Sequence, residues 1–98
     1  MIYTQIPSTY KYDTLAEALY SREMEHFHYN LDAVNFTHLL ETEVDGPYKQ
    51  ELQARLASTL EQMQKVDSIY TALSAQIEDP VLYAEAVERA ALKRNALK

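Results

Sequence analysis

The chain has 98 residues, one glycine, no cysteine and a net charge of −6. This length suits one domain, and the composition excludes disulfide frameworks, thiolate zinc sites and glycine-rich phosphate loops. Residues 13–46 hold eight acids and one base, so the chain lacks the clustered Lys and Arg with which proteins bind nucleic acid or anionic membranes directly.

Residues 1–12 predict an extended N-terminal arm, because strand-favouring residues precede Pro7, which blocks a helix. These residues show no signal peptide, and no apolar run reaches the roughly 18 residues of a membrane span. We therefore expect a cytoplasmic protein, or a virion-associated one if it is viral. Tyrosine is enriched at interfaces, so Tyr3, Tyr10 and Tyr12 are expected to contact the helices or a neighbouring subunit.

Residues 13–98 predict a single helical domain whose helices cover about 14–42, 47–77 and 80–96. Thr14 and Glu17 form a capping box at the first helix. Asp45-Gly46-Pro47 separates the first two helices, and Asp79-Pro80 begins the third. Such short connections favour antiparallel neighbours. The predicted fold is all-α: a long antiparallel helical hairpin plus a shorter third helix, forming a three-helix bundle with the N-terminal arm.

Apolar spacing shows how the hairpin packs. The second helix carries one heptad seam: Leu52, Leu56, Thr59, Met63, Val66, Tyr70, Leu73 and Ile77. The first helix carries two stripes, which is more than one partner helix requires. One stripe comprises Tyr20, Met24, Phe27, Leu31 and Val34, and the other Leu15, Leu19, His26, Tyr29, Ala33, Phe36 and Leu40.

The third helix is predicted to be too short to cover the whole hairpin. At 1.5 Å per residue it reaches about 26 Å, against about 43 and 46 Å for the first two. It is expected to cover residues near 15–33 and 59–78 and to leave the hairpin tip open. Together with the three arm tyrosines, the candidate interface residues are Phe27, Tyr29, Phe36, Leu39, Leu40, Val44, Tyr48 and Leu52.

Glu23 and His26 form a Glu-x-x-His pair, which places both side chains on one helix face. The spacing resembles the ligand motif of the ferritin-like di-iron carboxylate bundles, which use two such motifs and two further glutamates. Because residues 47–98 contain no histidine, a metal site here implies an oligomer interface at which a second copy supplies the other motif. The alternative is a solvated charged flank, with His26 in an aromatic interface.

The function expected from these features is a non-enzymatic helical interaction or assembly protein without a cofactor. It is expected to bind itself or another protein, and neither nucleic acid nor a membrane directly. Its size, heptad seam, acidic helix and aromatic arm suit an accessory or structural protein of a phage or virus. One alternative is an acidic regulator or inhibitor that binds a basic, nucleic-acid-binding partner through the first helix. The other is a metal-binding helical protein that uses Glu23 and His26.

Overall fold

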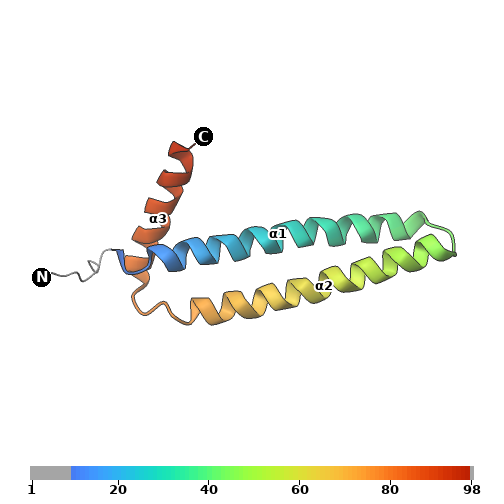
Figure 1. The fold of residues 1–98 in the computed structure, drawn as a ribbon, viewed down its shortest axis with the longest axis horizontal. Coiled ribbons are helices and arrows are strands. Elements are labelled where there is room, and N and C mark those ends of the chain that lie inside the picture. The colour runs from blue at the N-terminus through green and yellow to red at the C-terminus, as the bar shows by residue number, and fades with distance from the viewer. Residues whose placement is uncertain (1–9, 98) are drawn as a thin grey trace, which may run out of the picture. The chain divides into compact units, whose positions relative to one another are not determined.

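A computed structural model describes residues 10–97 and consists of three helices (Figure 1). They are α1 (Asp13–Thr42), α2 (Pro47–Ser74) and α3 (Pro80–Ala96). The predicted all-α fold is confirmed, with a long antiparallel hairpin and a shorter third helix. Most of the predicted arm, including Tyr3, lies outside the described residues. Residues 10–12 form a short turn that leads into α1, rather than extended chain.

Turn and cap residues set most helix ends. Gly46 adopts a φ of +154°, a conformation that side-chain-bearing residues rarely adopt. The Asp79 carboxylate accepts hydrogen bonds from the N–H groups of Val81 (3.0 Å) and Leu82 (3.2 Å), which makes it the N-cap of α3. The N–H of Ala16 donates to the carbonyl of Tyr12, so α1 begins one residue before Thr14. Thr14 therefore lies inside the first turn and does not cap it.

The end of α2 differs from the prediction, because the helix stops at Ser74 and not near Ile77. Beyond Ser74 the backbone forms tighter i to i+3 hydrogen bonds, from the N–H of Gln76 to Leu73 (3.0 Å) and from the N–H of Ile77 to Ser74 (3.1 Å). A tightened last turn of this kind commonly ends a helix.

The chain divides into two compact units. Among the described residues, unit 1 comprises residues 10–21 and 71–97, and unit 2 comprises residues 22–70. Both α1 and α2 contribute to both units. None of the described helices has a stretch that is long and apolar enough to cross a membrane.

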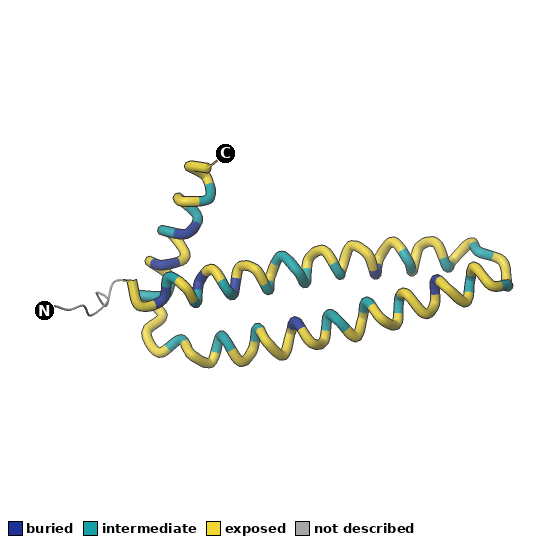
Figure 2. Tube along the Cα trace, viewed as in Figure 1, coloured by how far each residue is buried: buried dark blue, intermediate teal, exposed yellow. Residues whose placement is uncertain are grey.

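Unit 2 is the antiparallel hairpin of α1 and α2, which run side by side in opposite directions (Figure 1). Along both helices, buried and half-buried residues recur between exposed ones (Figure 2). Leu52 and Val66 are buried, and the seam positions between them are half-buried. On α1 the facing stripe is likewise buried or half-buried: His26, Tyr29, Ala33, Phe36 and Leu40. The heptad spacing therefore identified the inner face of the hairpin.

Unit 1 has a small core of Tyr12, Ala16 and Ala86, flanked by Leu15, Leu82 and Tyr83. The phenol oxygen of Tyr12 accepts hydrogen bonds from the backbone N–H groups of Glu78 (3.1 Å) and Asp79 (3.0 Å). Its ring meets Tyr83 edge-on, with 6.3 Å between the ring centroids. Tyr12 thus fastens the start of α1 to the loop before α3.

Charged side chains of α3 pair with the first turns of α1 in unit 1. Arg89 donates to Asp13 from Nη2 (2.6 Å) and from Nε (3.1 Å). Lys93 lies 3.8 Å from Glu17, and the Arg94 guanidinium lies 3.6 Å from the centroid of the Tyr20 ring. These C-terminal bases are therefore paired within the chain.

Candidate interaction surface

The outer stripe of α1 is a row of exposed apolar side chains in the middle of the helix. We define it as Phe27, Leu31 and Val34, whose exposed fractions are 52%, 45% and 57%. Their spacing of four and three residues places them on one helix face. The other face of α1 already packs on α2, so within unit 2 the outer stripe has no helix against it. The predicted cover of α3 over residues near 15–33 stays a prediction.

Four polar residues without a carboxylate flank the middle of the outer stripe. His28 and Asn35 flank it on one side, and Asn30 and Thr37 flank it on the other; all four are exposed. The ring of His28 also meets Phe27 edge-on, with centroids 5.7 Å apart. An apolar strip with an uncharged polar rim has the composition of a protein interface, whose centre is depleted in charge.

Only some of the residues predicted to be exposed at the hairpin tip are exposed. Leu39, Val44 and Tyr48 expose large apolar surfaces there. Phe36 and Leu40 are half-buried in the seam between the helices. These two side chains stabilise the hairpin, because they belong to the inner stripe of α1.

Three predicted contact residues serve the chain's own core. Tyr12 and Leu52 are each 3% exposed, and Tyr29 is half-buried in the hairpin seam. Tyr12 and Leu52 therefore keep almost no surface for a partner, whereas Tyr29 keeps part of its surface. Tyr10 is exposed at the start of the described chain, with the Arg89 guanidinium 4.9 Å from its ring centroid.

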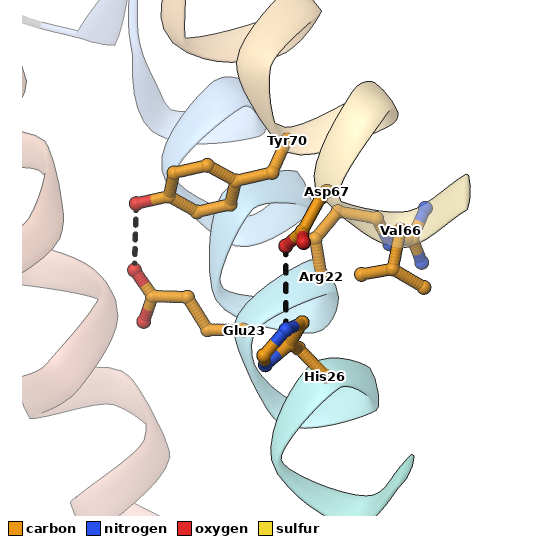
Figure 3. A pocket seen from close by; sticks show the side chains of 6 residues that line it. All are labelled: Arg22, Glu23, His26, Val66, Asp67 and Tyr70. Carbon is orange, nitrogen blue, oxygen red and sulfur yellow. Dashed lines mark hydrogen bonds and ion pairs between the residues drawn. The ribbon is translucent and has the colours of Figure 1, made fainter. Parts of the chain in front are cut away.

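Glu23 and His26 line a pocket of about 230 Å³ on the hairpin (Figure 3). Its other lining residues are Arg22, Val66, Asp67 and Tyr70. The Tyr70 hydroxyl donates to Glu23 (3.0 Å), and His26 Nε2 lies 3.3 Å from the Asp67 carboxylate. Sequence reasoning did not identify Asp67 and Tyr70 as neighbours of this pair, because their proximity depends on the register between the two helices.

This arrangement directs Glu23 and His26 to different partners. Within the described residues, no group of three or more His, Asp and Glu side chains is placed to hold a metal ion. A metal bound by Glu23 and His26 would therefore need ligands from another chain. The predicted metal role remains a prediction.

A second hollow, of about 310 Å³, lies beside the outer stripe. Val34 lines it together with Ala33 and with Leu56 and Leu60 of α2, and the rest of its lining is polar: Thr37, His38 and Glu41. Leu60 is one of the exposed apolar residues that sequence reasoning missed, although it directly follows the seam position Thr59. The apolar surface around Val34 therefore extends from α1 towards α2.

Comparison of the chain with models of known protein families, with curated proteins and with solved structures gave no match.

Proposed function

We propose that this chain is a non-enzymatic helical interaction or assembly protein that acts as an oligomer or within a larger complex. The observation that carries the proposal is the outer stripe of α1. Three large apolar side chains are about half-exposed on a helix whose opposite face is already packed. Contiguous exposed apolar surface on a folded protein marks interaction sites.

The size of the stripe sets the expected affinity. Full burial of a Val, Leu or Phe side chain stabilises by about 1.5–3 kcal/mol, so covering the exposed halves adds about 1 kcal/mol each. Two copies meeting through this stripe would gain roughly 6 kcal/mol before the entropic cost of association. The cost of association is about 4–15 kcal/mol, so the stripe alone leaves a net gain of at most about 2 kcal/mol. A micromolar complex requires about 8 kcal/mol net, so it needs further buried surface beside the stripe. Tip residues such as Tyr48 add apolar area for a larger complex.

The two alternatives have less support. An acidic regulator would use its carboxylates, but the four residues that flank the outer stripe, His28, Asn30, Asn35 and Thr37, carry none. Asp32 is exposed in the same segment but lies about 100° around the helix from Leu31. A basic partner would instead be drawn to Glu23, Glu41 and Asp67 near the two hollows, and its binding would weaken steeply with salt. A metal-binding role would place Glu23 and His26 at an oligomer interface. A role as a phage or viral accessory protein rests on the sequence features alone.

The test compares the parent protein with Leu31→Glu, which places a carboxylate in the stripe. Ile69→Glu is the matched control, because Ile69 is also 45% exposed but lies on α2. Self-association is measured by sedimentation over about a hundredfold range of protein concentration, which extends high enough to detect weak binding. Binding to other proteins is measured by capture from the native source. We expect Leu31→Glu to reduce association and Ile69→Glu to leave it unchanged. The proposal would be refuted if the parent protein is monomeric at every concentration and captures no protein whose binding is lost in Leu31→Glu.

A further inference from the structure

We propose that the outer stripe of α1 binds the same stripe of a second copy, with the two helices antiparallel about a two-fold axis at Leu31. This inference rests on the proposed function and specifies the partner and the register. An interface between identical chains must be self-complementary, because each contact occurs twice. The stripe meets that requirement in both shape and charge.

The shape argument starts from the spacing along the helix. Phe27 lies four residues before Leu31, and Val34 lies three residues after it. When two copies of α1 run antiparallel with their Leu31 residues opposed, Phe27 faces Val34 of the second copy on each side of the axis. A large side chain thus meets a small one twice. Alternation of large and small residues across facing positions is what lets helix surfaces interdigitate.

The same register extends one turn further in each direction. Met24 is half-buried on the outer side of α1 and faces His38 of the second copy. His38 is well exposed and lies 3.7 Å from Glu41 in its own helix. A flexible Met side chain suits an irregular contact with an imidazole ring at the edge of an interface.

The charge argument explains why a chain of net charge −6 can associate with itself here. The rim residues that meet across the antiparallel pair are uncharged: Asn30 faces Asn30, and His28 faces Asn35 of the second copy. Glu23 is the first acid on the N-terminal side of the rim, and it faces Thr37 of the second copy rather than another carboxylate. No like charges are opposed within the central contact.

A parallel pair would be worse on both counts. It would set Phe27 against Phe27 and Val34 against Val34, leaving a bulge at one end and a gap at the other. It would also oppose Glu41, which continues the stripe seven residues after Val34, with the Glu41 of the second copy, and like charges across an interface are unfavourable. A basic partner would find no carboxylate to pair with along the centre of the stripe. The second copy, antiparallel, is therefore the occupant that the residues favour.

Single-cysteine variants give a direct test, because the chain has no cysteine of its own. Leu31→Cys lies on the two-fold axis, so mild oxidation with copper-phenanthroline in air should yield a disulfide-linked dimer. Ile69→Cys is the equally exposed control and should stay monomeric. Phe27→Cys alone should not crosslink, because the two thiols lie about 12 Å apart along the antiparallel pair, beyond disulfide reach. A mixture of Phe27→Cys and Val34→Cys chains should form the mixed dimer, identified by its intact mass.

Sedimentation of the full chain supplies an independent measurement. Leu31→Glu places two carboxylates at the axis and should weaken dimerisation by at least about a hundredfold, against less than about threefold for Ile69→Glu. Association should persist in about 1 M salt, because the central contact is apolar and uncharged.

The outcomes separate the register from the broader function. Self-crosslinking of Phe27→Cys would show a parallel pair and overturn this inference. A parent dimer that Leu31→Glu does not weaken would place the interface elsewhere, so the inference would fail while the proposed function stood. If the chain forms a stable complex with a different protein and Leu31→Cys forms no dimer, the inference also fails while the proposed function stands. A monomeric Leu31→Cys variant whose thiol resists maleimide would place another part of the same chain on the stripe and would contradict both.

Discussion

Removal of the Tyr12 hydroxyl tests the clamp between the start of α1 and the loop before α3. Tyr12→Phe keeps the ring, which is 3% exposed in the core of unit 1, so the buried apolar area is unchanged. The substitution removes only the oxygen that accepts the N–H groups of Glu78 and Asp79. Any loss of stability can therefore be assigned to those two hydrogen bonds.

The magnitude follows from the exposure of the two donors. A typical intramolecular hydrogen bond contributes about 0.5–1.5 kcal/mol net, and a donor left buried without an acceptor costs more. Glu78 and Asp79 are exposed residues whose hydrogen bonds to Tyr12 are part-buried, so the freed N–H groups incur only part of the full desolvation penalty. We therefore expect Tyr12→Phe to lower the free energy of unfolding by about 2 kcal/mol. For a domain of this size that corresponds to roughly 8–16 °C in Tm.

Urea unfolding followed by far-ultraviolet circular dichroism measures the total change. Because the chain has two compact units, hydrogen exchange is needed to locate it. Amides of residues 76–90 should exchange faster in Tyr12→Phe, while those of residues 47–66 should be unaffected. Tyr10→Phe is the control, because Tyr10 is about half-exposed and its phenyl ring can still contact Arg89. A change below about 0.5 kcal/mol, with unaltered exchange at residues 78 and 79, would refute the clamp.

Four further substitutions test the caps, the turn and the core. Asp79→Ala removes the N-cap acceptor of α3 and should cost about 1 kcal/mol in urea unfolding, with Asp79→Asn largely restoring it. Gly46→Ala should destabilise by about 1 kcal/mol because of the positive φ, although no atom lies within 4 Å of the added Cβ; an unchanged Tm would count against that strain. Ala86→Leu should cost about 1–3 kcal/mol and alter the near-ultraviolet spectrum, because Ala86 is fully buried beside aromatic rings. Asp13→Asn should cost no more than about 1 kcal/mol, and the difference from the parent should shrink in about 1 M salt, because its ion pair with Arg89 is partly exposed.

Spacing predicts the inner face of the hairpin because helix packing repeats every seven residues. Leu52 and Val66 are buried, and the intervening seam positions are at least half-buried. The turn at Gly46 and the cap at Asp79 are also predictable, since each depends on local backbone chemistry. The end of α2 cannot be predicted from the sequence, because no glycine or proline marks Ser74 and the helix ends only through a change to i to i+3 hydrogen bonds.

The residues whose positions the sequence predicted wrongly, or did not predict, all depend on contacts between distant parts of the chain. Local sequence puts Tyr12 in an arm because its neighbours favour extended chain, yet it is buried against Ala16 and Ala86. Its partners Glu78 and Asp79 are 66 and 67 residues away, and no local pattern marks them. The same limit applies to the pocket, where spacing singles out Glu23 but not its partner Tyr70. In the candidate interface, the second stripe of α1 is visible from spacing, but which of the two stripes faces α2 is not.

The Tyr12 clamp also bears on the order in which the chain folds. Contacts in the hairpin begin next to Gly46 and can extend outward a turn at a time, so each new contact closes only a short additional loop. The clamp joins residues 12 and 79, and the Asp13–Arg89 pair spans 76 positions. Unit 1 is therefore expected to form late, after the hairpin has brought its two ends together. During synthesis, residues 10–21 have no native core until α3 has left the ribosome. Loss of α3 should then leave the start of α1 frayed and susceptible to proteases while the hairpin remains folded.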